Sequence, residues 1–373
     1  MEKIQRRTWL KQGSLLIAGF GLTGNIFGRE KGEYRFDEKL PASNFVKLSS
    51  NENPYGPSPM ARKAMAAAIA TSNRYPWQIT DALRKKIGSM FGLDENHVLM
   101  GAGSSEILGN VAAFTGREKG NAVSPHPTFR LWWQAAESFG LSIKKVPLTN
   151  DKKINTATLL AAMDGETRLL YICNPNNPTG TVIPAEELKR CIETVSAQAM
   201  VLLDEAYTEY SDEPSMAALV ATNKNLVVAK TFSKIYGMAG ARAGYALAHP
   251  DTIKKLAAYQ PWANAGVSAV SLAGAMASLD DADFVKLARA NNDSVKKYTV
   301  PIMEAMHINV IPSHTNFLYY QINGFNGDFP KTINSETMNA VRVFEDNGNW
   351  FRTSIGTQDE MKAFIGTVKE KWT

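Results

Sequence analysis

Cysteine is scarce in this chain of 373 residues, which contains only Cys173 and Cys191. Two cysteines cannot form a disulfide framework, and Cys173 lies in an apolar run where a small buried side chain is expected. Repeats and low-complexity tracts are also lacking. The formal charge is only +5, and the first 28 residues hold four basic side chains against one acidic one. The remainder is too weakly basic to favour nucleic-acid binding. With 44% hydrophobic residues, the composition is that of a globular protein with room for two domains.

The first 28 residues have no apolar run long enough to span a membrane comfortably. Arg6 and Arg7 precede a bulky apolar pair and Lys11, and a weakly apolar, glycine-containing run extends from Ser14 to Phe27. This pattern resembles a bacterial twin-arginine export signal, and a basic amphipathic N-terminus is the alternative. We therefore predict export to the periplasm by the twin-arginine route, with only transient membrane contact. If residues 1–28 are an ordinary extension, we expect a cytoplasmic protein.

The segment Asn225 to Ala246, NLVVAKTFSKIYGMAGARAGYA, carries the strongest chemical signal. A lysine at the end of a buried strand, such as Lys234, has a lowered pKa and can form an imine with a carbonyl compound. Arg242, with Thr231 and Ser233, can form an anion pocket beside that amine. A carbonyl and a phosphate held side by side suggest pyridoxal phosphate. A plain strand and turn with a solvated lysine is the alternative.

Short apolar strands alternate with helical patterns along the chain. We expect strands at 97–100, 121–124, 142–147, 169–173, 200–203 and 226–229. Helical patterns cover 59–70, 79–91, 104–114, 129–139 and 185–196. This alternation favours an α/β three-layer sandwich, in which helices cover both faces of a mostly parallel sheet. After the signal-like segment 1–28 we predict an N-terminal arm at 29–58, a large domain at 59–260 and a smaller α/β C-terminal domain at 261–373.

Polar clusters follow four of these strands. They are the segments 101–106 (GAGSSE), 174–180 (NPNNPTG), 204–207 (DEAY) and 231–234 (TFSK). In open α/β sheets, ligands bind outside the carboxyl ends of the strands, so we expect the four clusters to form one site. Gly103, Ser104 and Ser105 open a helix whose free N–H groups can hold a phosphate, although an ordinary N-cap explains them equally well.

Asp204 closes an apolar strand, where an unpaired carboxylate would be costly. A protonated pyridine nitrogen would satisfy this carboxylate, and the retained charge would let the ring accept electrons. Tyr207 and Asn177 can donate hydrogen bonds to the phenolic oxygen of the ring. Taken alone, Asp204 is better explained as a helix cap, and the segment 174–180 as a turn.

Six motifs together resemble the fold-type I pyridoxal-phosphate aminotransferases of classes I and II. They are NENPYG (51–56), GAGSSEIL (101–108), NPNNPTG (174–180), DEAY (204–207), TFSKIYGMAGARAGY (231–245) and FRTSIG (351–356). The pattern is most similar to histidinol-phosphate aminotransferases. The resemblance implies a homodimer with the transferase fold of these enzymes, and pyridoxal 5′-phosphate as the cofactor.

The same resemblance implies a role for each candidate residue. Lys234 would form the imine with the cofactor, Asp204 would face its pyridine nitrogen, and Asn177 and Tyr207 would face its phenolic oxygen. The residues at the phosphate would be Ser104, Ser105, Thr231, Ser233 and Arg242, with Tyr55 reaching over from the second subunit. Arg352 corresponds to the arginine that binds the substrate α-carboxylate, where Asn177 and Tyr55 would also contact the substrate.

Two features depart from the family pattern. Phe129 stands where the family usually has a tyrosine stacked on the cofactor ring, so the stacking is kept and the hydroxyl is lost. The stretch before Arg352, VRVFEDNGNW, is shorter than in the usual histidinol-phosphate pattern. Aminotransfer is therefore a firmer prediction than the identity of the substrate.

We predict an aminotransferase that moves an amino group between a 2-oxo acid and an amino acid or amino-acid-like amine, such as histidinol phosphate or an aromatic amino acid. Lys234 would take the proton from the substrate Cα. A decarboxylase or other lyase of the same fold would use the same cofactor residues and is the main alternative. A non-catalytic pyridoxal-phosphate sensor is a further alternative. Neither a metal site nor a nucleic-acid partner is predicted.

Overall fold

The computed structural model describes residues 45–325, 327–344 and 349–372. The predicted export signal at 1–28 and residues 29–44 of the predicted arm lie outside the described residues. Within the described part of the chain, no helix has both the length and the apolar character needed to cross a membrane.

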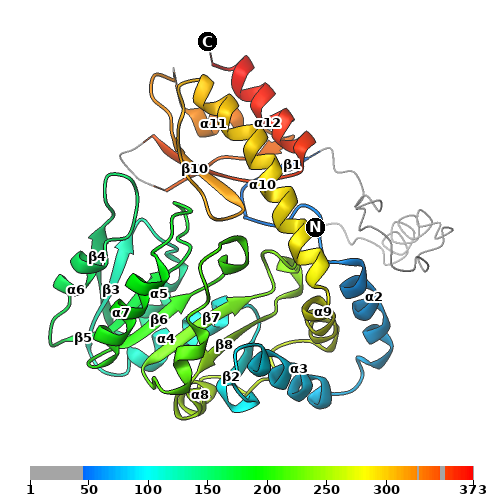
Figure 1. Cartoon of the computed structure of the whole chain (residues 1–373). Coiled ribbons are helices and arrows are strands. Elements are labelled where there is room, and N and C mark those ends of the chain that lie inside the picture. Colours follow the sequence, from blue (N-terminus) through cyan, green and yellow to red (C-terminus); the bar gives the residue numbers. More distant parts are fainter. Residues whose placement is uncertain (1–44, 326, 345–348, 373) are drawn as a thin grey trace, which may run out of the picture. The chain divides into compact units, whose positions relative to one another are not determined.

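Among the described residues, the largest sheet has seven strands in the order β2-β8-β7-β6-β5-β3-β4 (Figure 1). The strands are β2 Val98–Gly101, β3 Gly120–His126, β4 Leu141–Pro147, β5 Thr167–Cys173, β6 Met200–Asp204, β7 Leu226–Thr231 and β8 Gly244–Ala248. Neighbouring strands pair in parallel, except that β8 is antiparallel to both β2 and β7. The prediction of a mostly parallel α/β sheet is confirmed.

Helices cover both faces of this sheet. They include α4 Ser104–Thr115, α5 Leu131–Ser138, α6 Thr156–Ala161, α7 Ala185–Ser196 and α8 Pro250–Ala257. Strands β2, β6, β7 and β8 are buried at every position, as expected when both faces are covered. One face packs against α4, α5 and α8 in a core that includes Trp132, Tyr171 and Leu202. Each large apolar side chain buried there contributes about 2 kcal/mol to stability.

Two expected elements begin or end differently in the structure. Residue His97 was expected in a strand but belongs to a short 3-10 helix, Glu95–His97, because the Asp94 carboxylate accepts from Asn96 N at 2.9 Å and caps that turn. The helix expected from residue 129 begins at Leu131. The loop before this helix is bonded to the segment after β5, because Thr128 Oγ1 donates to Asn176 Oδ1 at 2.7 Å.

A three-helix group lies beside the sheet (Figure 1). It consists of α2 Pro59–Ala68, α3 Trp77–Met90 and α9 Ala269–Asp280, with α9 packed against the other two. Helix α2 starts at a proline after Ser58, whose hydroxyl accepts from Ala61 N at 3.1 Å. The approach of α2 to α9 requires Gly274, because a Cβ there would lie 2.6 Å from Met65 Cγ.

A second core forms around the C-terminal elements. They are α10 Ala282–Ala305, β9 Asn309–Ile311, β10 Phe317–Gln321, α11 Phe329–Ile333, β11 Met338–Asn339, β12 Arg342–Val343, β13 Trp350–Ser354 and α12 Gln358–Glu370. Strands β12, β13, β10 and β9 form an antiparallel sheet in that order. Strand β1 (Val46–Lys47) pairs with β11, and Leu48 lies in this second core. The end of the predicted arm therefore packs with C-terminal residues. The domain boundary at residue 260 stays a prediction.

Candidate active site

Lys234 lies in the turn that joins β7 to β8. Its Nζ is 3.4 Å from the Ser50 carbonyl oxygen and 5.5 Å from the centroid of the Tyr207 ring. Burial, followed by the positive charge of Arg352, lowers the pKa of Lys234 to about 8. A larger fraction of this amine is therefore neutral near pH 7 than in an ordinary lysine, and the neutral amine is the nucleophile.

Asp204 lies at the carboxyl end of β6 and is 3% exposed. Its carboxylate accepts from the Tyr171 hydroxyl at 3.1 Å and from Ala206 N at 3.2 Å. Burial raises the pKa of Asp204 to about 6 in spite of these bonds. A cationic partner placed against this carboxylate would be stabilised by it and would favour its ionised form.

Tyr207 and Asn177 belong to one hydrogen-bond network with Arg352. The Tyr207 hydroxyl oxygen accepts from Asn51 Nδ2 at 2.9 Å and from Asn177 Nδ2 at 3.3 Å. The Asn177 amide oxygen accepts from Arg352 Nη1 at 2.7 Å. Arg352 Nη2 donates to the Ser49 carbonyl oxygen at 2.8 Å. The predicted cofactor residues and the predicted carboxylate-binding residue are thus brought together.

Arg352 lies on β13 and is 5% exposed. Its guanidinium is 5.4 Å from the centre of the Phe317 ring and 4.8 Å from that of Phe344. Burial lowers the pKa of Arg352 to about 10. Among the described residues, its buried Nε has no hydrogen-bond partner. An unsatisfied buried donor is costly, and a carboxylate reaching Arg352 would satisfy it.

The start of α4 forms a cradle suited to an anion. Gly103, the N-cap, has φ +83° and supplies no side-chain cap to the free N–H groups of the first turn. Arg242 lies against it, because a Cβ at Gly103 would be 2.5 Å from Arg242 Nη2. A Cβ at Gly244 would be 2.4 Å from Ser104 N, so β8 approaches the same turn closely. Ser105 is exposed beside the half-buried Ser104.

The hydroxyls predicted at the phosphate are linked to each other. Thr231 Oγ1 donates to Ser233 Oγ at 2.9 Å and accepts from Ser233 N at 3.0 Å. Arg242 has φ +56° and donates from Nη1 to the Ala239 carbonyl at 2.9 Å. These bonds hold the turn after β7 in one conformation next to Lys234.

Glu106 holds the turn before α4, and the sequence pattern predicts no role for it. Its carboxylate accepts from Ala102 N and from Gln260 Nε2, at 2.6 and 2.7 Å. Gln260 Nε2 also lies 2.7 Å from the Met100 carbonyl oxygen. Glu106 stood inside the GAGSSEIL motif, but its partner Gln260 is 154 residues away and gave no local signal.

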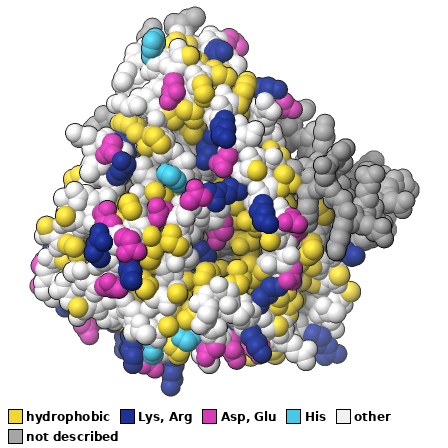
Figure 2. Space-filling model, viewed as in Figure 1, with side chains coloured by type: hydrophobic (Ala, Val, Ile, Leu, Met, Phe, Trp, Pro, Cys, Tyr) yellow, Lys and Arg dark blue, Asp and Glu magenta, His cyan; other side chains and the backbone are white. Residues whose placement is uncertain are grey.

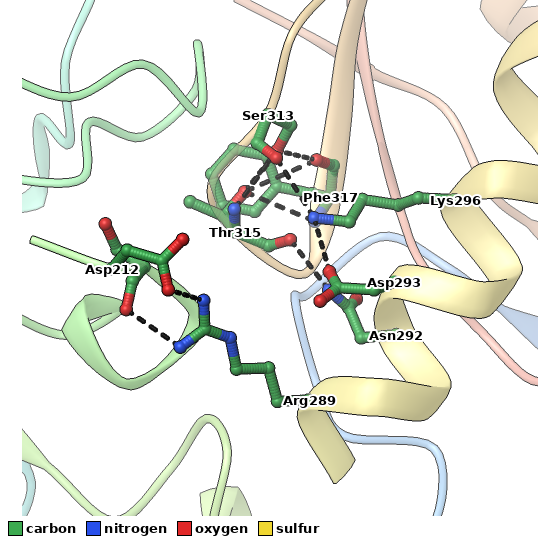
Figure 3. Close-up of polar contacts among 9 residues, drawn as sticks. Asp212, Arg289, Asn292, Asp293, Lys296, Ser313, Thr315 and Phe317 are labelled. Atoms are coloured by element: carbon green, nitrogen blue, oxygen red, sulfur yellow. Dashed lines mark hydrogen bonds and ion pairs between the residues drawn. The ribbon is translucent and has the colours of Figure 1, made fainter. Parts of the chain in front are cut away.

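A polar network links the loop that contains Asp212, helix α10 and the loop before β10, which it fixes up to the Phe317 carbonyl (Figure 3). Arg289 on α10 bonds to Asp212, while Asn292 donates to the Thr315 carbonyl at 3.1 Å and Lys296 donates to the Ser313 carbonyl at 3.0 Å. Phe317, which follows this loop, packs edge-on against the Tyr207 ring with centroids 5.2 Å apart. The network thereby holds a side chain that contacts both Tyr207 and Arg352.

Phe129 and Tyr55, also predicted to contact the cofactor, have none of the hydrogen bonds to Lys234, Asp204 or Tyr207 described above. Phe129 is half-buried and packs against the core of the large sheet. Tyr55 is half-buried, and burial followed by the charge of Glu360 raises the pKa of its phenol. Its loop packs on its own chain, since a Cβ at Gly237 would lie 2.0 Å from the Gly56 carbonyl oxygen. The reach of Tyr55 into a second subunit stays a prediction.

The donor set fits pyridoxal 5′-phosphate. A buried carboxylate with a raised pKa suits a protonated pyridine nitrogen, and the Tyr207 and Asn177 groups suit a phenolic oxygen. The uncapped start of α4, next to the Arg242 guanidinium, suits a phosphate. Lys234 would supply the amine that reacts with the aldehyde.

Comparisons with known proteins agree with this geometry. The family model "Aminotransferase class I and II" matches residues 43–368. A histidinol-phosphate aminotransferase of Symbiobacterium thermophilum is 36% identical over 338 residues, covering 89% of this chain and 91% of that protein. An aromatic amino acid aminotransferase of Mycobacterium bovis is 35% identical over 329 residues, covering 86% and 90%. The crystal structure of histidinol-phosphate aminotransferase from Sinorhizobium meliloti in complex with pyridoxal-5′-phosphate is similar in fold, with a TM-score of 0.80 at 22% identity over 95% of this chain and 98% of that one.

Proposed function

We propose the substrates and assembly of this chain from the family to which it belongs, the class I and II aminotransferases. It is a pyridoxal-phosphate-dependent aminotransferase, which moves an amino group between an amino compound and a 2-oxo acid. A decarboxylase of the same fold is less well supported, because the relatives described above are aminotransferases.

The proposed roles follow from the positions of the side chains. The bound cofactor supplies an electron sink for the bonds at the substrate Cα. Lys234 Nζ takes up and returns the Cα proton, a task suited to an amine whose pKa is about 8. Asp204 keeps the pyridine nitrogen protonated, and Tyr207 donates to the phenolic oxygen. Arg352 orients the substrate through its carboxylate.

The proposed amino donor is an aromatic amino acid. The buried Arg352 with its unsatisfied Nε calls for an anionic group on the donor, which the carboxylate of an amino acid or the phosphate of histidinol phosphate would supply. The observation that carries the choice of an aromatic donor is the half-buried Phe344 ring beside that guanidinium. The Phe317 and Phe344 rings pack on the same guanidinium, and Phe344, which is half-buried, offers apolar surface beside it. The named relatives include aminotransferases of both kinds.

A panel of donors with 2-oxoglutarate tests this proposal. Phenylalanine, tyrosine and tryptophan should give glutamate with a higher kcat/KM than histidinol phosphate. A higher kcat/KM for histidinol phosphate would contradict the donor assignment. Carbon dioxide and an amine as products would identify a decarboxylase instead, and no turnover with any donor would favour a sensor.

The proposed assembly is a homodimer. Tyr75, Trp77 and Trp262 form an aromatic cluster with ring centroids 4.7 to 5.8 Å apart, in which Tyr75 is 71% and Trp262 55% exposed. Met60 and Ile69 are exposed on the helices nearby in the chain, and Figure 2 shows apolar side chains gathered toward the middle and lower right of the viewed face. Exposed apolar clusters of this kind mark interfaces. Light scattering should give a dimer for the wild type and a monomer for Trp262→Lys, and a monomeric wild type would contradict the proposal.

Export by the twin-arginine route is the proposed fate of the chain. It rests on Arg6 and Arg7 ahead of a weakly apolar run, and on a cofactor site whose residues come from distant strands and exist together only after folding. Replacement of Arg6 and Arg7 by lysines should keep the protein in the cytoplasm of a bacterial host, because the pathway distinguishes guanidinium from ammonium. Periplasmic Lys-Lys variant in normal amount would contradict the route.

A further inference from the structure

The segment 49–51 passes across the candidate active site. Its first carbonyl accepts from Arg352 Nη2 at 2.8 Å, and its second carbonyl lies 3.4 Å from Lys234 Nζ. Its third residue, Asn51, donates from Nδ2 to the Tyr207 hydroxyl oxygen at 2.9 Å. The sequence pattern alone predicts no role for Asn51.

Asn51 is held from several directions. It is 1% exposed and has φ +54°, a conformation that asparagine adopts more readily than most residues. Its N–H donates to Ser354 Oγ at 2.7 Å, and the Ser354 hydroxyl donates to Asn51 Oδ1 at 3.0 Å. Asn316 Nδ2 donates to the Asn51 carbonyl at 3.0 Å. These bonds place the side-chain amide in one orientation.

The orientation of two amides determines the direction of the Tyr207 proton. Because Asn51 Oδ1 accepts from Ser354, its Nδ2 faces Tyr207. Because Asn177 Oδ1 accepts from Arg352, its Nδ2 also faces Tyr207. A phenol oxygen has two lone pairs and one proton, so both lone pairs receive N–H groups and the proton is left to donate elsewhere.

We propose that Asn51 is a positioning residue that holds the Tyr207 hydroxyl as a hydrogen-bond donor to the phenolic oxygen of the cofactor. The inference rests on the proposed function, because Tyr207 meets that oxygen only in an enzyme that binds the cofactor. Ser354 lies two residues after Arg352, so the same amide joins the strand that binds the carboxylate to the cofactor site.

Asn51→Asp tests the proposal, because it keeps the size of the side chain and replaces the donor by an acceptor. The Tyr207 proton then turns to the new carboxylate and leaves the phenolic oxygen with more negative charge. The visible absorption of the bound cofactor should titrate about one pH unit higher than in the wild type. The dissociation constant of pyridoxal phosphate from the apoenzyme should rise about tenfold.

Asn53→Asp is the matched control in the same loop. The Asn53 amide donates to the Ile235 carbonyl at 2.7 Å, so this variant should lower Tm and leave the absorption titration unchanged. The double variant Asn51→Asp with Tyr207→Phe should titrate like Tyr207→Phe alone, because Asn51 acts through that hydroxyl. Additive shifts, or an equal shift in Asn53→Asp, would overturn the proposal.

If Asn51→Asp does not fold, Ser354→Ala tests the role of Asn51 in its place. It keeps Asn51 and Tyr207 and removes the hydroxyl that orients the amide, so it should shift the titration in the same direction by a smaller amount. An unchanged titration would overturn the role of Asn51. A wild type that binds no cofactor would contradict the proposed function instead, so the two failures are distinguishable.

Discussion

Asn177 and Arg352 lie 175 residues apart and share a buried hydrogen bond of 2.7 Å from Arg352 Nη1 to Asn177 Oδ1. The same Asn177 amide donates to the Tyr207 hydroxyl, so a substrate carboxylate bound at Arg352 would be linked to Tyr207 through one side chain. The effects of substitutions at these three positions should therefore be coupled rather than additive.

The covalent role of Lys234 is tested with Lys234→Ala. Borohydride reduction of the wild-type holoenzyme should attach the cofactor irreversibly to the peptide that contains Lys234, because its buried amine reacts in the neutral form. The variant should take up no label at that position. Label on another lysine of the wild type, detected by peptide mass spectrometry, would refute the assignment.

The raised pKa of Asp204 has a consequence for the stability of the apoenzyme. Burial raises this pKa from 3.8 to about 6, so the folded state binds more protons than the unfolded state between these values. Stability therefore falls as the pH rises through that window, by at most about 3 kcal/mol. Asp204→Asn should raise the Tm of the apoenzyme at pH 7 and change it little at pH 4.

The same substitution should lower turnover of the holoenzyme by about a hundredfold or more, because the pyridine nitrogen is no longer kept protonated. The cofactor should remain bound. Near-normal turnover of Asp204→Asn would contradict a role for Asp204 in catalysis, even if the predicted change in Tm were observed.

Substrate recognition by Arg352 is tested with Arg352→Lys. An ammonium cannot reproduce the two bonds that the guanidinium makes to Asn177 and Ser49 while also receiving a carboxylate. The KM for amino acid donors should rise by about a hundredfold, in line with a loss of about 3 kcal/mol. The dissociation constant of the cofactor should change little, whereas its absorption titration should shift, because Arg352 orients the Asn177 amide that faces Tyr207. An unchanged KM for every amino acid would contradict the role.

The anion cradle is tested by two substitutions in one region of the chain. Gly103→Ala places a Cβ 2.5 Å from Arg242 Nη2 at a positive φ, so it should weaken cofactor binding by at least tenfold. Gly109→Ala, on α4, meets no atom within 4 Å and serves as the control. Equal dissociation constants in the two variants would contradict the placement of the phosphate.

Residues whose signal is local were predictable from the sequence. Lys234 and Asp204 each end or follow an apolar strand, and the structure places both at the carboxyl edge of the large sheet. The direction of β8 was not predictable, because an apolar run reads the same in a parallel and an antiparallel strand. The contacts of Asn51 were also not predictable, because Tyr207 lies 156 residues away in the sequence. The φ of +54° at Asn51 cannot be inferred from the residue type alone.

A single-turnover experiment tests the central claim most directly. Purified holoenzyme is mixed with an excess of phenylalanine and no 2-oxo acid, and the products are counted per site. We expect one equivalent of the 2-oxo acid for each Lys234 site, no carbon dioxide, and resumption of turnover only when 2-oxoglutarate is added. Continuous release of carbon dioxide and amine without an acceptor would contradict that claim.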